Sequence, residues 1–355
     1  MVDDERASVV EHFRRQAAAC DRLGSPFYGS LLRRLADDAA ENGITAHLLL
    51  GHGGDLEDRA LALRLLGGVH RLVLDGRAPL LARRYPSVGG DGDAEAAATP
   101  FLAMLAAEED TVRDALRRAP QTNEIGRSAA LVGALCHLSQ AQPLPIRLVE
   151  LGASAGLNLR CDRFEIRTED GRSYGSAGSP ALLDRAWRGR LPPMTRPFDL
   201  AERTGCDPHP VDPCTGDGAL TLTSYVWPDQ PDRLARLRGA LVVATEVPAT
   251  VVRAGAAEFV DRVEPQSGTW LVVWHSIMWQ YLAADEQEAV RRRLDQLGAA
   301  ATTDAPVAHV AFEPRQAESG QAFVITVQTW PDVGLGTGER VLGHAPPHGI
   351  PVDWA

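Results

Sequence analysis

Residues 146–158 read Ile-Arg-Leu-Val-Glu-Leu-Gly-Ala-Ser-Ala-Gly-Leu-Asn, and this stretch decides the fold class. Ile146–Leu151 is a short apolar run of the kind that forms a buried strand, and Gly152–Gly156 is a loop of small residues. Small residues let a ligand approach the backbone closely, and a helix that begins after such a loop offers free N–H groups. We therefore expect a strand, a ligand-binding turn and a helix, with Glu150 as an acceptor for ligand hydroxyl or ammonium groups.

Strand-like and helix-like segments alternate after this loop. Strands separated by helices predict parallel pairing with right-handed crossovers. The interval between residues 312 and 323 is too short for a helix, so it predicts an antiparallel pair. The sequence thus predicts an α/β fold, a mostly parallel sheet with an antiparallel edge strand. The expected strands are 197–207, 250–252, 269–274, 307–312, 323–329 and one near Val341, and the expected helices are 231–244, 256–263 and 285–297.

The first 140 residues predict helices only. Ser25-Pro26 and Thr99-Pro100 each combine a capping hydroxyl with a proline suited to the first helical turn. Further helices are expected from Asp55 and from Thr122, with a Gly/Asp/Ala loop over 86–98. We therefore expect a helical domain, 1–140, and a sheet domain, 141–355, the latter with an insertion over about 160–196 that contains a small hairpin.

Charge and composition exclude several classes of function. The 355 residues include 36 basic and 47 acidic ones, which gives a net charge of −11. We therefore expect no nucleic-acid partner and no association with an anionic membrane surface. Every basic residue is arginine. Schiff-base enzymes, Walker-type phosphate loops and lysine general bases are excluded, because each needs the lysine amine itself.

Cysteine usage and the N-terminus predict the compartment. The five cysteines are widely spread and form no Cys-x-x-Cys pair, which is typical of reduced thiols in a cytoplasmic protein. Cys206-x-x-His209-x4-Cys214 supplies only three soft ligands, so we expect no metal. Residues 1–6 do not resemble a signal peptide, and 239–252 is too short an apolar run to span a bilayer. We expect a cytoplasmic protein.

The stretch 150–156 resembles the Asp/Glu-x-Gly-x-Gly-x-Gly motif of class I methyltransferases that use S-adenosylmethionine, with Ser154 at the middle glycine. That superfamily has a Rossmann-like fold, which the order of the later segments also resembles. The resemblance implies that Glu150 and the backbone of Gly152–Gly156 face the methionine moiety of the cofactor. It also implies that Asp207, at the end of the second strand, binds the ribose hydroxyls. The cofactor-binding set is Glu150, Gly152, Ala153, Ser154, Gly156, Asn158, Asp207 and Ser276.

Two departures from that superfamily pattern are visible. Gly152 and Asp207 are 55 residues apart, against about 20 in a compact dinucleotide-binding unit, which is why an insertion is expected. The third-strand motif Gly-Asp-Ala is replaced by Gly255-Ala256-Ala257, so recognition of adenine must come from another group.

Two other interpretations of the loop stay open. Gly152–Gly156 also matches the Gly-x-Ser-x-Gly nucleophile elbow of α/β-hydrolases, with His52-Gly53-Gly54 as an oxyanion loop. A serine esterase would need downstream partners for Ser154 such as Asp332 and His348. Against it, Glu150 would repel the developing oxyanion. The third interpretation is a glycine turn that only lets a helix pack on a strand.

The segment after the strand 269–274 supplies the candidate catalytic residue. His275 and Ser276 fall beyond the carboxyl end of that strand, where ligands bind in open α/β sheets. His275 is the candidate base for the methyl acceptor, although a buried structural histidine is an equal alternative. The other candidate lining residues of a substrate pocket, each also explicable by packing or surface pairing, are Asn123, Arg127, Trp227, Trp279, Tyr281 and Glu313.

Taken over nearly its full length, the chain resembles an uncharacterised bacterial family with a methyltransferase-like fold. The resemblance rests on 122–127, 150–158, 225–230 and 275–282. We expect methyl transfer from S-adenosylmethionine to a small molecule lodged under the helical domain. A serine esterase and a catalytically inactive binding protein are the alternatives.

Overall fold

The computed structural model describes residues 2–51, 60–317, 320–336 and 338–355, which divide into two compact units. Met1–Thr122 and Thr215–Leu234 form the helical unit, and Asn123–Cys214 and Ala235–Ala355 form the sheet unit. The boundary differs from the expected one near residue 140 because the helix that precedes the first strand packs on the sheet. Among the described residues, no helix is long and apolar enough to cross a membrane.

Several helices of the helical unit begin at a capping side chain or at a proline. Ser25 accepts a hydrogen bond from Tyr28 N at 3.4 Å, and Pro26 follows at the first helical position, as predicted. The predicted cap at Thr99 is wrong: the helix begins at Ala94 behind Asp93, and Pro100 lies inside it. The expected start at Asp55 lies outside the described residues. The α-helices are α1 (Val2–Arg22), α2 (Pro26–Ala40), α3 (Ile44–Leu49), α4 (Leu61–Leu74), α5 (Pro79–Ala82), α6 (Ala94–Ala107), α7 (Glu109–Leu116) and α9 (Gly216–Ser224), and α10 (Pro231–Glu246) begins here.

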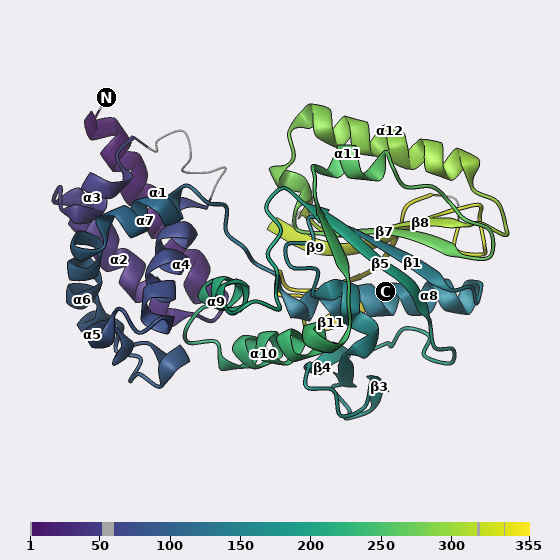
Figure 1. The fold of residues 1–355 in the computed structure, drawn as a ribbon, viewed down its shortest axis with the longest axis horizontal. Helices are drawn as coiled ribbons and strands as arrows, with labels where there is room; N and C mark the ends of the chain where they lie inside the picture. Colours follow the sequence, from purple (N-terminus) through teal and green to yellow (C-terminus); the bar gives the residue numbers. More distant parts are fainter. Residues whose placement is uncertain (1, 52–59, 318–319, 337) are drawn as a thin grey trace. The chain divides into compact units, whose positions relative to one another are not determined.

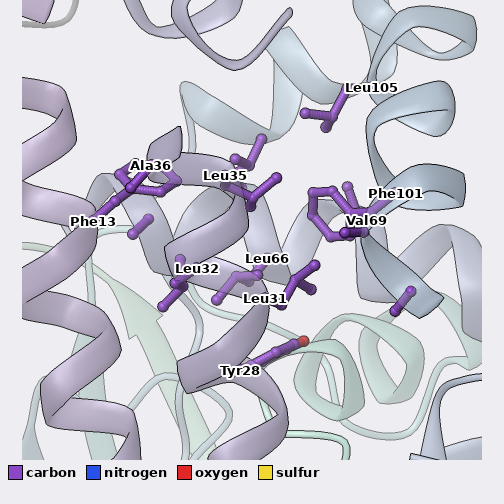
Figure 2. Close-up of a cluster of buried hydrophobic side chains, with 14 of the residues drawn as sticks. Phe13, Tyr28, Leu31, Leu32, Leu35, Ala36, Leu66, Val69, Phe101 and Leu105 are labelled. Carbon is purple, nitrogen blue, oxygen red and sulfur yellow. The ribbon is translucent and has the colours of Figure 1, made fainter. Parts of the chain in front are cut away.

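Figure 2 shows the core of the helical unit, in which side chains of α1, α2, α4 and α6 meet. Leu31, Leu32 and Leu35 are fully buried on one face of α2. This face follows the helical repeat of three to four residues that the sequence shows. Burial of apolar area at about 25 cal/mol per Å² is the main stabilising contribution to such a core.

Asp229 links the start of α2 to the segment after α9. Ser25 Oγ donates to Asp229 Oδ1 at 2.5 Å, and Phe27 N donates to Asp229 Oδ2 at 2.9 Å. Ser25 is fully buried, so its hydroxyl both caps the helix and partners a carboxylate.

We predict that Ser25→Ala destabilises the helical unit by about 1–2 kcal/mol, because the helix loses its cap and Asp229 loses a donor. Chemical denaturation followed by circular dichroism measures the change. Ser8→Ala, which removes an exposed hydroxyl bonded to Asp4 O, is the control and should change stability by less than about 0.5 kcal/mol. Equal effects of the two substitutions would contradict the assignment.

The sheet unit is built on one mixed, mostly parallel sheet of eleven strands in the described part of the chain. Five neighbouring strands, in the order β6-β5-β1-β7-β8, pair in parallel, and β8 and β9 form the predicted antiparallel pair. This pair is not at the edge as expected, because β10, β11 and the insertion continue the sheet beyond it. The strands are β1 (Ile146–Leu151), β2 (Glu165–Thr168), β3 (Ser173–Gly175), β4 (Leu182–Arg188), β5 (Leu200–Asp207), β6 (Thr250–Arg253), β7 (Trp270–Ser276), β8 (Val307–Ala317), β9 (Gly320–Trp330), β10 (Arg340–His344) and β11 (Val352–Trp354).

Helices cover both faces of this sheet (Figure 1). On one face, α11 (Ala256–Val260) and α12 (Ala284–Ala300) bury Val149, Leu151 and Val273. On the other face lies α8 (Ser128–Ala141), where Trp187 Nε1 of β4 donates to Ala129 O at 3.0 Å. Because successive side chains of a strand alternate between faces, Glu150 points away from the face that Leu151 occupies.

Candidate functional site

The strand order reverses between β1 and β7. The chain runs from β1 to β5 and β6 on one side, then returns to place β7 and β8 on the other side of β1. In open parallel sheets, ligands bind outside the carboxyl ends of the strands at such a switch point. Here the register sets Glu150 opposite Trp274 and Leu151 opposite His275. The fold therefore places the motif residue Glu150 where a ligand site is expected.

The loop after β1 has a fixed and partly strained backbone. Gly152, Ser154 and Gly156 have φ of +69°, +53° and +65°. Left-handed backbone costs a non-glycine residue such as Ser154 roughly 1–2 kcal/mol. Three hydrogen bonds offset this cost: Ala153 N donates to Cys206 O, Ser154 N to Asp207 Oδ2 and Leu157 N to Asn123 Oδ1, each at 2.9 Å.

The predicted helix after the loop is absent from the described chain at this point. The 3-10 helix η4 (Asn158–Arg163) follows instead, with a kink at Arg160, and it leads directly into β2. The insertion takes up the chain that would otherwise form the helix. The N–H groups of a helix N-terminus are therefore not a feature of this site, and the strand–turn–helix geometry of a hydrolase elbow is not formed.

Glu150 is buried among polar side chains and lacks one partner. Trp274 Nε1 donates to Glu150 Oε1 at 3.2 Å, whereas Oε2 has no hydrogen-bond partner of normal geometry. Burial raises the pKa of Glu150 from 4.5 to about 8, against smaller lowering effects of Trp274, Asn158 and Arg127. A cationic ligand group next to Oε2 would favour the ionised carboxylate.

Residues just before α8 and its first residue connect the loop after β1 to the end of β7. Ser128 Oγ donates to Asn158 Oδ1 at 2.7 Å, and Asn123 accepts from Leu157 N as described above. Arg127 donates through Nη1 to Ser276 O at 3.1 Å and through Nε to Pro347 O at 3.2 Å. The predicted residues Asn123, Arg127, Glu150, Asn158 and Ser276 are thus brought together at the carboxyl ends of β1 and β7.

Asp207 supports the backbone at the end of β5. Its Oδ2 accepts from Ser154 N at 2.9 Å and its Oδ1 accepts from His209 N at 2.8 Å. Each oxygen therefore has one lone pair already used for protein contacts. The prediction that Asp207 binds ribose hydroxyls stays a prediction, since each oxygen can accept a second hydrogen bond.

His275 lies in a buried chain of titratable side chains on the face of α11 and α12. Its Nδ1 is 2.7 Å from Glu313 Oε1, and its Nε2 is 2.9 Å from His309 Nε2. Burial, together with the nearby His275, lowers the pKa of His309 to about 3. Both ring nitrogens of His275 are engaged, and Glu150 lies on the other face of the sheet. This setting differs from that expected of a base aimed at a ligand beside Glu150.

The segment after β7 is held by Glu313 and covers part of the loop. Glu313 Oε1 accepts from Met278 N at 3.1 Å and Trp279 N at 3.3 Å. Trp279 stacks on His275 with ring centroids 5.0 Å apart, and Arg291 lies over its ring at 5.1 Å. Met278 packs so closely on Gly152 that a Cβ there would lie 3.1 Å from the methionine side chain. The Met278 side chain thus packs against the space that a Cβ on Gly152 would occupy.

The two remaining pocket residues have different settings. Tyr281 is 62% exposed. Trp227 belongs to the core of the helical unit, where its ring lies 6.5 Å from Tyr28 and 5.6 Å from the Arg233 guanidinium. The contacts of Trp227 are therefore those of a core residue, which is the alternative to a role in lining a substrate pocket.

The residues predicted as catalytic partners of Ser154 in an esterase make contacts of their own. Asp332 Oδ1 accepts from Gly334 N and Gly336 N of its own loop, at 2.8 and 2.9 Å. His348 Nδ1 lies 3.5 Å from Glu124 Oε2. His52-Gly53-Gly54, the expected oxyanion loop, lies outside the described residues.

The sequence did not point to Ser128, Trp274 or His309. Trp274 could have been found from the predicted strand 269–274, whose alternation places it and His275 on opposite faces. Ser128 and His309 meet their partners only through helix packing and strand register, which no local motif specifies.

Comparison with known protein families identifies the family to which the chain belongs. The family model described as an uncharacterised protein conserved in bacteria (DUF2332) matches residues 10–354. The chain belongs to the DUF2332 family. The resemblance to an uncharacterised bacterial family is confirmed, and no curated protein or solved structure matches the chain.

Glu150 should make the stability of this DUF2332 protein depend on pH. Its folded pKa of about 8 exceeds the ordinary value of 4.5, so its contribution to stability is fully present below pH 4.5 and is lost as the pH rises through 8. We predict that stability of the wild type relative to Glu150→Gln falls by about 1.4 kcal/mol per pH unit within this window.

Denaturation followed by tryptophan fluorescence measures this, since six of the seven tryptophans lie in the sheet unit. Glu202→Gln is the control, because Glu202 pairs with Arg147 at 2.6 Å at the other end of β1. The stability of Glu202→Gln should depend on pH as that of the wild type does. The same pH dependence in Glu150→Gln and the wild type would contradict the burial argument.

Proposed function

We propose that the sheet unit binds S-adenosylmethionine at the carboxyl ends of β1 and β5 and transfers its methyl group to a small molecule. The observation that carries this proposal is the Glu150 carboxyl, buried at the switch point with Oε2 unpartnered. An uncompensated buried carboxylate is costly, and pairing with a cation removes much of that cost. The cofactor carries two such cationic groups, an ammonium and a sulfonium.

The residues present fit this cofactor in part. Glu150 offers a free acceptor atom, and the loop over Gly152–Gly156 adjoins it. Asp207 retains one acceptor lone pair on each oxygen for a ribose hydroxyl. In the sequence, Ala256 stands where the superfamily pattern has an adenine-binding aspartate, so we propose no side-chain partner for adenine there.

These contacts suggest separate roles for the cofactor, Glu150, the loop and His275. When bound, the cofactor supplies an electrophilic methyl on a sulfonium. Glu150 would complement its positive charge, and the three hydrogen bonds that fix the loop would hold the backbone in place without reorganisation on binding. The buried chain of Glu313, His275 and His309 orders the segment that follows β7. We therefore give His275 a structural role in this proposal and assign no base for the acceptor.

Isothermal titration calorimetry of the full chain with S-adenosylmethionine tests the proposal. Because Glu150 is largely protonated below its pKa of about 8, pairing with a cation should release a proton. At pH 7 we expect release of up to about one proton per cofactor, seen as different enthalpies in phosphate and in Tris buffer. Glu150→Gln should weaken binding at least about tenfold and abolish the release.

The control is Glu202→Gln, which should bind as the wild type does. Absence of binding by the wild type would sink the methyltransferase proposal and favour an inactive binding protein. Labelling of Ser154 by a fluorophosphonate, with turnover of aryl esters, would instead support the serine esterase.

A further inference from the structure

A buried histidine of the helical unit lies between a serine hydroxyl and a backbone carbonyl. His70 is on α4, Ser87 is on the 3-10 helix η2 (Pro86–Val88), and Ser224 is the last residue of α9. His70 Nδ1 is 3.0 Å from Ser224 O, and His70 Nε2 is 2.8 Å from Ser87 Oγ. Three separate segments thus meet at one imidazole ring, which is fully buried.

The carbonyl of Ser224 fixes the tautomer of His70. A carbonyl oxygen only accepts hydrogen bonds, so Nδ1 carries a proton and donates it to Ser224 O. Burial lowers the pKa of His70 from 6.5 to about 4, so the ring is neutral at pH 7 and its Nε2 has a free lone pair. Ser87 Oγ therefore donates to His70 Nε2. A serine hydroxyl that donates to a neutral imidazole is the arrangement of a nucleophile and its base.

The C-terminus of α9 supplies the third group of such an arrangement, the one that orients the base. The last carbonyls of a helix have no partner within it, and they carry a partial negative charge. Ser224 O holds the His70 ring from this position, and its hydrogen bond opposes the effect of burial on the pKa of His70. The same partial charge stabilises an imidazolium, the form that His70 takes when it accepts a proton. Tyr85 packs beside the imidazole, with ring centroids 5.3 Å apart.

The turn that carries Ser87 lies at the surface of the helical unit. Ser87 is half-buried, and Val88, the next residue, is 42% exposed. A Cβ on Gly89 would meet nothing within 4 Å, so there is open space beside this turn. Gly90 N donates to Tyr85 O at 2.9 Å and closes the turn. The hydroxyl is therefore accessible on a turn of fixed geometry, with an apolar side chain next to it in the chain.

We propose that Ser87 is a nucleophile activated by His70, and that the helical unit hydrolyses esters of small apolar acyl groups. Ser87 Oγ forms a bond to the ester carbonyl carbon while its proton passes to His70 Nε2. The bond to the leaving oxygen then breaks, and that oxygen takes the proton from His70. Water attacks the acyl group on Ser87 and gives a proton to His70, which returns it to Ser87 Oγ as the acyl bond breaks. The products are an alcohol and a carboxylic acid. This activity is separate from the methyl transfer proposed for the sheet unit.

Labelling of the full chain with a fluorophosphonate tests the nucleophile. The labelled peptide is identified by mass spectrometry, and we expect the label on Ser87. Ser87→Ala should lose the label and at least about tenfold of the rate at which para-nitrophenyl acetate is hydrolysed. Ser30→Ala is the matched control, because Ser30 is a serine of the same unit whose hydroxyl donates to Glu95 Oε1 at 2.8 Å. This control should keep both the label and the rate.

His70→Gln tests the base. Loss of the imidazole should slow labelling of Ser87 at least about tenfold. His47→Gln should leave the labelling rate unchanged, because His47 is exposed and pairs with Glu109 at 3.3 Å. Equal labelling rates in His70→Gln and the wild type would overturn the role of His70.

The position of the label in the wild type decides the proposal even if His70→Gln fails to fold. A label on Ser87 supports the proposal. A label on Ser154 would overturn it and favour the serine esterase of the sheet unit. Absence of a label on either serine would also overturn it.

Discussion

The candidate site depends on the burial of the Glu150 carboxyl group. Glu150 is the last residue but one of β1, at the point where the strand order reverses. The interior around it offers one indole donor to Oε1 and none of normal geometry to Oε2. A carboxyl group so placed is favoured in its neutral form and is poised to ionise when a positive charge arrives. The adjoining loop is rigid for a separate reason, since three residues from two other segments, strand β5 and the stretch before α8, accept its N–H groups.

The two faces of the sheet divide the polar residues of this region. Glu150, Trp274, Asn158 and Ser128 form one buried cluster on the side of α8. His275, His309 and Glu313 form another on the side of α12. Each cluster holds a buried carboxylate oxygen without a hydrogen-bond partner, Glu150 Oε2 in the first and Glu313 Oε2 in the second. Only the first of these oxygens adjoins the loop of small residues after β1. The second cluster uses its histidine nitrogens internally and anchors the backbone of Met278 and Trp279, which is a structural task.

Periodicity and composition predicted much of the fold. They did not predict which side chains meet across neighbouring strands or between a helix and the sheet. Strand β1, the antiparallel pair β8–β9 and helix α12 were visible because their apolar patterns are local. The start of α6 was missed because a proline inside a helix looks like a proline at its beginning. Asn158 was found from its motif, yet its partner Ser128 was not, since their meeting depends on how α8 packs. Strand register paired His275 with His309, and sequence spacing carries no information on register.

The position of β11 has a consequence for how the protein matures on the ribosome. This short strand pairs with β10 on one side and with β4, from the early insertion, on the other. Its Trp354 fills the space above Gly133 of α8 and meets the ring of Trp187. Helix α8 and β4 are synthesised long before residues 352–354 leave the exit tunnel. Their apolar surfaces therefore stay uncovered, exposed to aggregation or shielded by chaperones, until residues 352–354 have left the tunnel.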